Sequence, residues 1–198
     1  MKRVLLSLIC GIFLIGMVTG CDNAKNSNNK NSFANADIII NGNKYTLPVD
    51  FSELEKKENL ELDDEMYITE LDSFVSFDSS LYLNSRNVFN VTFQNRTETK
   101  DDIKNAKIVS ISQSGYQVKN MKVIFPGDLY VGEKMTQEEI ISILGTPTDI
   151  TETSNEVLLK YGDKYEFSHG NSTNQYYYEV SISSDIINGL ELLSTIEK

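Results

Sequence analysis

The chain contains 198 residues, 40% of them hydrophobic, with a formal net charge of -11, one His, two Cys and no Trp. This size and this apolar fraction allow one large domain or two small ones, and they exclude a wholly disordered chain. The excess of 29 acidic over 18 basic residues argues against a protein that binds nucleic acid, because phosphate groups require a cationic surface. Few side chains suited to catalysis are present, so the composition indicates location and architecture more clearly than a reaction.

The first 20 residues have the features of a secretory signal peptide. Lys2 and Arg3 precede an apolar run from Val4 to Val18, and small residues follow that run. A positive segment, an apolar segment of this length and small residues at its end are typical of a signal that is removed after export. The run is shorter than a comfortable bilayer span, which needs about 20 apolar residues. We therefore expect residues 1–20 to be absent from the mature protein.

The end of this signal carries the most specific motif in the chain. Val18-Thr19-Gly20-Cys21 resembles the bacterial lipobox, in which an apolar residue and two small residues precede a Cys. The resemblance implies a diacylglyceryl group on the Cys21 thiol, cleavage between Gly20 and Cys21, and acylation of the new N-terminus by a fatty acid such as palmitate. Two acyl chains, each contributing about 0.8 kcal/mol per buried CH2, hold a protein stably on a membrane. The alternative is ordinary signal cleavage beside a coincidental Cys.

The use of Cys agrees with a lipid anchor. Cys10 lies within the signal, so Cys21 is the only thiol expected in the mature chain. If Cys21 carries lipid, no disulfide can form and the fold depends on its core. Loss of residues 1–20 removes two positive charges and no negative ones, which changes the net charge from -11 to -13. We expect anionic headgroups to repel so acidic a body, which the anchor alone then holds at the membrane.

Residue usage and the expected signal together predict where the protein is found. The chain has 15 Lys, only 3 Arg and 19 Asn, a usage typical of an AT-rich genome and of a low-GC Gram-positive bacterium. The expected location is the extracytoplasmic face of the cell membrane. Residues 21–36 are expected to be the lipidated Cys and a disordered tether, because residues 22–36 contain six Asn and a single large apolar side chain.

Two units of similar length are expected beyond the tether, the first over residues 37–118. Ile38 to Ile40, the turn Asn41-Gly42 and the apolar residues that follow predict a hairpin. Asp50 and Glu53 have the spacing of a capping box that opens a short helix. Strand-forming residues then fill residues 74–93 and 108–111, with a charged loop or helical turn between them.

The second unit, residues 119–198, repeats this plan. Thr136 and Glu139 form a second capping box, an apolar stripe follows to Leu144, and Gly145 ends the helix. Strands are expected over Val157–Tyr161, Tyr165–Ser168, Tyr176–Ser183 and Ile186–Leu193. Because each unit combines one short helix with antiparallel strands, the expected class is α+β, with two tandem lobes that each pack a helix on a sheet.

The second helix and its flanks carry a family resemblance. Residues 132–147, GEKMTQEEIISILGTP, resemble the signature of BamE (SmpA/OmlA) lipoprotein domains and their β-lactamase-inhibitor-protein-like relatives. Leu159-Lys160-Tyr161 matches a strand with an early Tyr in that family, and residues 42–48 resemble its divergent tandem partner. The resemblance implies a lipid-anchored binding or scaffold module that works by contact, with no catalytic residues, and it implies that the sheet face opposite each helix is the binding surface.

Little in the chain is typical of catalysis or of metal binding. The one His, His169, lies in a polar loop with no partner indicated for general-base chemistry. One His and no free Cys exclude a zinc site of thiolates and imidazoles within the mature chain. Residues 63–65 and Asp101-Asp102 offer oxygen ligands that suit calcium, but neither has the spacing of an EF-hand, so solvated acidic loops are the other interpretation. We expect no cofactor.

Aromatic residues are stronger candidates for a contact surface than the His and acidic residues are for a catalytic or metal site. Tyr176, Tyr177 and Tyr178 lie on an expected strand, so the side chains of Tyr176 and Tyr178 share one face and that of Tyr177 lies on the other. Tyr is enriched at protein interfaces because it offers a large contact area with a polar tip. One interpretation is a partner-binding patch. The other is that one face packs beneath the second helix while the opposite face carries a lone exposed Tyr.

These observations favour a non-enzymatic protein that binds another envelope protein, with the membrane reached only through the lipid anchor. The alternative is an envelope hydrolase or a small-ligand-binding lipoprotein that uses carboxylates in a cleft between the lobes. A deep cleft with facing carboxylates favours the alternative, and a shallow, open sheet face with aromatic side chains favours binding. A solute receptor that closes two lobes on its ligand is disfavoured by the length of the chain.

Overall fold

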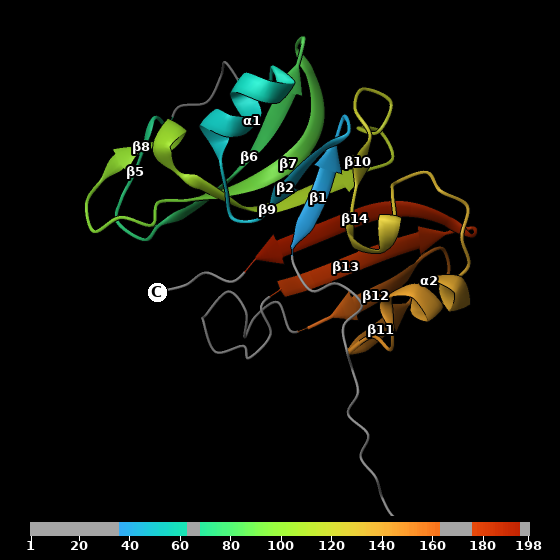
Figure 1. Ribbon diagram of the computed structural model, residues 1–198. Coiled ribbons are helices and arrows are strands. Elements are labelled where there is room, and N and C mark those ends of the chain that lie inside the picture. The colour runs from blue at the N-terminus through green and yellow to red at the C-terminus, as the bar shows by residue number, and fades with distance from the viewer. Residues whose placement is uncertain (1–35, 63–67, 163–175, 195–198) are drawn as a thin grey trace, which may run out of the picture.

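The computed structural model describes residues 36–62, 68–162 and 176–194. It has a mixed α+β fold in which β-sheet dominates (Figure 1). The strands of the first half are β1 (Asp37–Ile40), β2 (Asn43–Thr46), β3 (Val49–Asp50), β4 (Glu61–Leu62), β5 (Glu70–Leu71), β6 (Ser76–Leu83), β7 (Arg86–Gln94), β8 (Asp101–Asp102) and β9 (Lys107–Ser114). Those of the second half are β10 (Val123–Ile124), β11 (Asp149–Glu152), β12 (Val157–Tyr161), β13 (Tyr176–Ser183) and β14 (Ile186–Ser194). The helices are α1 (Phe51–Glu58) and α2 (Gln137–Leu144), with short 3-10 turns at Ile103–Asn105 and Pro126–Asp128.

One large sheet joins the two halves of the chain. Its order is β11-β12-β13-β14-β9-β7-β6-β4, with β3 also paired to β9. The strands β6, β7 and β9 of the first half approach the middle of the sheet in chain order, and β12, β13 and β14 of the second half do the same from the other side. The halves meet where β9 and β14 pair antiparallel, with Leu192 opposite Ile111. We call this β9–β14 boundary the seam.

A small sheet of three strands also crosses between the halves. Its order is β10-β1-β2, and Ile39 of β1 lies opposite Ile124 of β10. The expected hairpin is therefore confirmed as β1 and β2, and β10 of the second half pairs with β1 of the first. A two-stranded sheet of β5 and β8 lies apart from both.

Both helices and the small sheet contribute to one continuous core on one face of the large sheet. Phe51 and Leu54 of α1, Ile140 and Leu144 of α2 and Ile38 of β1 are all buried in the same hydrophobic cluster. In Figure 1, β1 and β10 lie between α1 and α2. One face of the large sheet is therefore covered by packed elements. The two halves of the chain therefore share one large sheet and one main core.

Helix α1 begins where the sequence predicts, but its cap differs from the prediction. Asp50 is the N-cap residue, yet its side chain makes no capping hydrogen bond. Its Oδ1 instead lies 2.7 Å from the Nζ of Lys107 on β9, because β3 and β9 pair at this point. The predicted Asp50–Glu53 capping box is therefore wrong. The helix ends at Asn59, which adopts the left-handed conformation with φ 55°, a conformation that Asn tolerates better than most residues.

Helix α2 follows its predicted signals closely. The Thr136 hydroxyl accepts a hydrogen bond from the Glu139 N–H at 3.3 Å, and the Glu139 carboxylate accepts one from the Thr136 N–H at 2.8 Å. Gly145 ends the helix with φ 88°, where a side chain would be strained. The predicted second capping box and C-cap are both confirmed.

Several expected features lie outside the described residues. These are the signal, Cys21, the tether up to residue 35, the acidic residues 63–65, the strand Tyr165–Ser168 and His169. Within the described ranges, no helix has both the length and the apolar character needed to cross a membrane.

Candidate binding surface

The face of the large sheet turned away from the main core carries polar residues from both halves, together with the buried apolar pair Tyr177 and Leu193. Directly paired residues of neighbouring strands point to the same face. The register aligns one row across six strands, from the second half to the first, as Lys160, Glu179, Glu191, Ser112, Asn90 and Ser80. A second row runs Tyr177, Leu193, Ser110, Thr92 and Asp78. We call the surface formed by these two rows the polar face.

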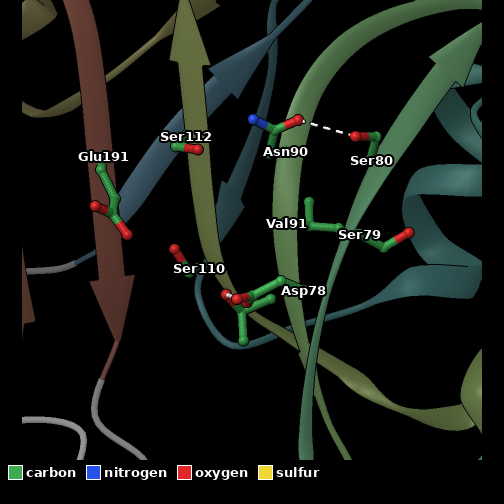
Figure 2. A pocket seen from close by; sticks show the side chains of 9 residues that line it. Asp78, Ser79, Ser80, Asn90, Val91, Ser110, Ser112 and Glu191 are labelled. Atoms are coloured by element: carbon green, nitrogen blue, oxygen red, sulfur yellow. Dashed lines mark hydrogen bonds between the residues drawn. The ribbon is translucent and has the colours of Figure 1, made fainter.

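A shallow hollow of about 380 Å³ lies on this face and crosses the seam. It is lined by Asp78, Ser79, Ser80, Asn90, Val91, Thr92, Ser110, Ser112 and Glu191, and we call it the polar trough. Figure 2 shows Glu191 on β14, Ser110 and Ser112 on β9, Asn90 on β7 and Ser80 on β6, side by side across the four strands. Its volume falls within the range of ligand-binding pockets, roughly 300–1,000 Å³.

The amide of Asn90 is held in one orientation by a chain of hydrogen bonds that starts at a backbone group. The Ser114 N–H donates to Oε1 of Gln117 at 2.9 Å, so the amide nitrogen of Gln117 must point the other way. That nitrogen donates to Oδ1 of Asn90 at 3.1 Å, and the Ser80 hydroxyl donates to the same oxygen at 2.9 Å. Because Oδ1 is occupied, the NH2 group of Asn90 points into the trough, toward Ser112 in Figure 2.

Two hydroxyl groups on β9 complete the middle of the trough. Ser110 is only 3% exposed, and Ser112 is half-buried. Both line the trough. Ser112 pairs across the sheet with Asn90 on one side and with Glu191 on the other.

Carboxylates stand at the two ends of the trough. Asp78 on β6 accepts a hydrogen bond from the Thr92 hydroxyl at 2.6 Å, and Glu191 lies on β14 directly opposite Glu179 on β13. Like charges in directly opposed positions repel one another. Glu179 also accepts a hydrogen bond from the Tyr177 hydroxyl. The lining residues include neither Lys nor Arg, so this surface attracts donors and cations and repels anions.

The predicted tyrosine patch is buried. Tyr178 is 0% exposed and packs in the main core between Phe125 and Tyr161, with ring centroids 6.3 Å away in each case. Tyr177 is 1% exposed and forms a second small cluster with Val109 and Leu193, next to the trough. Tyr176 is half-buried. The structure therefore places both Tyr177 and Tyr178 in packed interior positions, and neither offers an exposed surface to a partner.

The predicted acidic pair Asp101-Asp102 has a structural role. Asp102 caps the 3-10 turn by accepting from the Lys104 N–H at 2.8 Å, and Asp101 accepts from the Asn105 side chain at 2.9 Å. In the described residues, no three His, Cys, Asp or Glu side chains come together in a way that suits a metal ion.

Two other buried polar sites lie far from the trough. The carboxylate of Glu58 is 6% exposed and accepts hydrogen bonds from Asn41 and Asn43, each at 2.9 Å, and from the Tyr45 hydroxyl. Burial, and next the hydrogen bond to Glu58, raise the pKa of Tyr45. Burial alone raises the pKa of Tyr161 to about 12, and the Tyr161 hydroxyl finds no hydrogen-bond partner among the described residues. The hydrogen bonds of Glu58 connect the β1–β2 hairpin to α1, and Tyr161 packs in the core beneath α2.

The sequence analysis did not predict the trough residues, although their spacing in the sequence is typical of an exposed sheet face. Asp78 and Ser80, Asn90 and Thr92, and Ser110 and Ser112 are polar pairs two residues apart in expected strands, the spacing of one sheet face. The pattern marks exposed faces on three strands but does not show that the strands are neighbours. No protein-family model, no curated protein and no solved structure matches the chain.

Proposed function

We propose that this protein is a lipid-anchored, extracytoplasmic binding module that holds another envelope protein on the polar face of its large sheet, without catalysis. The observation that carries the proposal is that face: it runs across both halves of the chain, it is shallow, and it lies on the side of the sheet away from α1, α2 and the small sheet. A broad, shallow surface with many polar side chains suits contact with another macromolecule.

The anchor rests on the lipobox resemblance of Val18-Thr19-Gly20-Cys21. In the proposed arrangement, cleavage before Cys21 leaves two or more acyl chains on that residue, enough for stable attachment to the membrane. The tether up to residue 36 then gives the folded part a reach of about 20 Å. The acidic charge of the mature chain keeps the polar face free of the anionic headgroups.

The duplicated plan of the two halves supports the lobes proposed from sequence. Each half supplies one short helix followed by a meander of strands that ends at the seam, β6-β7-β9 in one and β12-β13-β14 in the other. We propose that the halves are tandem copies of one helix-on-sheet unit, of the kind that residues 132–147 resemble, fused through the β9–β14 pair.

The spacing of the two carboxylates in the trough favours binding over hydrolysis. Asp78 and Glu191 lie on strands separated by two others, so about 14 Å separates their strands at the usual strand spacing. Paired carboxylates that cleave a glycosidic bond lie about 5–9.5 Å apart. The hydrolase alternative therefore gains no support from this pair.

The test is to capture the partner in cells with a general amine-reactive and carboxyl-reactive crosslinker. We expect one specific adduct with the wild-type protein and its loss when Ser112→Tyr places a ring on the polar face. Ser52→Tyr, on an exposed position of α1, is the matched control and should keep the adduct. The proposal is wrong if the adduct survives Ser112→Tyr, or if the purified chain hydrolyses wall material.

A further inference from the structure

An exposed aromatic side chain, Phe74, occupies a tight turn whose backbone does not suit it. The Val75 N–H donates to the Asp72 carbonyl at 3.1 Å, so residues 72–75 form a β-turn with Phe74 at its third position. We call these four residues the Phe74 turn. Phe74 has φ 57°, in the left-handed region that Gly or Asn usually occupies at this position. The other non-Gly residues with positive φ in the described ranges are all Asn, Asp or Ser.

The fold gains little from an aromatic residue at this position. The Phe74 side chain is 53% exposed, and that of Val75 beside it is 43% exposed. The left-handed conformation is itself unfavourable for an L-residue with a side chain. Single exposed apolar residues are common on protein surfaces, but here exposure and an unfavourable backbone coincide at one residue. Because such backbone outliers cluster at binding and catalytic sites, the Phe74 turn is a candidate contact site.

A buried amide holds the chain on either side of the turn. Asn95 is 2% exposed, and its Nδ2 donates to the carbonyl oxygens of Leu71 at 2.9 Å and of Thr99 at 2.7 Å. Its Oδ1 accepts from the N–H of Thr97 at 2.9 Å and from the hydroxyl of Thr97 at 2.8 Å. Asn95 therefore joins the strand before the turn to the loop that follows β7.

Two further hydrogen bonds hold the turn itself against that loop. The Asn95 N–H donates to the Val75 carbonyl at 3.1 Å, and the Ser73 hydroxyl donates to the Thr97 carbonyl at 2.9 Å. Both neighbours of Phe74 in the chain are thus bonded to the segment after β7. A segment that is already ordered loses less conformational entropy when it binds. The turn presents Phe74 in a preorganised position.

Acidic side chains outnumber basic ones around the turn. The segments 68–76 and 94–105 contain five carboxylates and three basic side chains, which are Glu70, Asp72, Glu98, Asp101 and Asp102 against Arg96, Lys100 and Lys104. Asp72 is exposed in the turn itself. Anionic lipid headgroups repel such a surface, which argues against insertion of Phe74 into a bilayer. An apolar pocket in a protein, with Lys or Arg on its rim, complements both the ring and the charges.

From these observations we infer that the Phe74 turn is a second protein-contact site, in which Phe74 enters an apolar pocket of a partner protein and the surrounding carboxylates face basic side chains on the rim of that pocket. Aromatic residues that fill such pockets commonly contribute most of the binding energy of an interface. The turn leads into β6 at Ser76, and none of its four residues lines the polar trough. The inference goes beyond the proposed contact at the polar face and does not depend on it.

The experiment is a competition between two copies of the full-length chain in the same cells. A tagged copy carries p-benzoylphenylalanine in place of Phe74, which keeps an aromatic ring on the turn, and an untagged copy is expressed at increasing, measured levels. We expect one protein adduct, whose crosslinked peptide lies in an apolar pocket with more Lys and Arg than Asp and Glu around it.

The untagged copies distinguish a specific contact from chance proximity. The wild-type chain and Phe74→Tyr, which keeps the ring, should suppress the adduct equally. Phe74→Asn should need about tenfold higher expression for the same suppression, because truncation of a central aromatic contact typically weakens binding by that factor or more. Tyr116→Asn is the matched control, since it removes another aromatic side chain that is 66% exposed, and it should suppress the adduct as the wild type does.

Urea unfolding of the purified chains in detergent separates a contact from a structural role. Asn tolerates the left-handed conformation, so Phe74→Asn should unfold at the same urea concentration as the wild type or at a higher one. The inference is overturned if Phe74→Asn unfolds at a lower concentration, if it suppresses the adduct as well as the wild type does, or if no adduct forms. Crosslinks to lipid alone assign the turn to the bilayer, and crosslinks between two copies of this chain alone assign it to self-association; either result also overturns the inference. Contacts of the polar face are measured from other positions, so each proposal fails or stands on its own result.

Discussion

We expect the replacement of Tyr45 by Phe to destabilise the fold by about 2 kcal/mol, because it removes one of three donors to a buried carboxylate. Glu58 is 6% exposed and Tyr45 is 3% exposed, so water cannot easily replace the lost hydroxyl. A hydrogen bond to a charged group contributes about 1.5–3 kcal/mol. Asn41 and Asn43 still bond to Glu58 at 2.9 Å each, which places the expected loss in the lower half of that range.

The measurement is urea unfolding followed by far-ultraviolet circular dichroism, since the chain has no Trp. A loss of about 2 kcal/mol lowers the melting temperature by about 4–8 °C for a protein of this size. Tyr161→Phe is the matched control, because its hydroxyl is buried without a described partner, and it should unfold at the same urea concentration or a higher one. Equal destabilisation by both variants would refute the role assigned to the Glu58 cluster.

The remaining predictions concern helix caps, alkaline pH and the anchor. Thr136→Ala should lower the free energy of unfolding by about 1 kcal/mol, because the Thr136 side chain makes its capping hydrogen bond. Asp50→Ala should lower it by less, because that variant loses only an exposed ion pair with Lys107. Equal losses in urea unfolding would contradict the different roles assigned to these two N-cap residues. Burial raises the pKa of Tyr161 from 10.0 to about 12, so its contribution to stability is complete below pH 10 and is lost between pH 10 and 12, at about 1.4 kcal/mol per pH unit. Tyr161→Phe should therefore lose stability less steeply across that interval, and parallel curves would show that the pKa is not raised. Cys21→Ser should release the protein from membranes or leave its precursor uncleaved, and a mature, membrane-held variant in cell fractions would disprove the lipid anchor.

Local signals in the sequence were sufficient to predict short elements. They could not predict which distant strands pair with each other. The Asn41-Gly42 turn and the Thr136–Glu139 capping box depend on residues within four positions of each other, and both are present in the structure. Asp50 has the same local pattern, but its carboxylate forms an ion pair with Lys107, which is distant in sequence. A local pattern cannot show that such a distant residue will replace the capping hydrogen bond.

The seam and the trough depend on distant pairings in the same way. Ser112 on β9 lies beside Glu191 on β14, and nothing in either strand's own pattern selects the other. Tyr177 and Tyr178 illustrate a second difficulty, because alternation places them on opposite faces but does not tell whether each face is covered. Both side chains prove to be buried. Burial of a residue is set by elements that pack on it from elsewhere in the chain.

The most direct test of the central claim is site-specific photo-crosslinking in living cells, with the reactive residue placed at Thr92 on the polar face or at Ser52 on α1. We expect a discrete protein adduct from Thr92 and none from Ser52, because in the proposed arrangement the partner contacts the sheet face turned away from the helices. Adducts from Ser52 alone, or the same adducts from both positions, would contradict the assignment of the polar face as the binding surface.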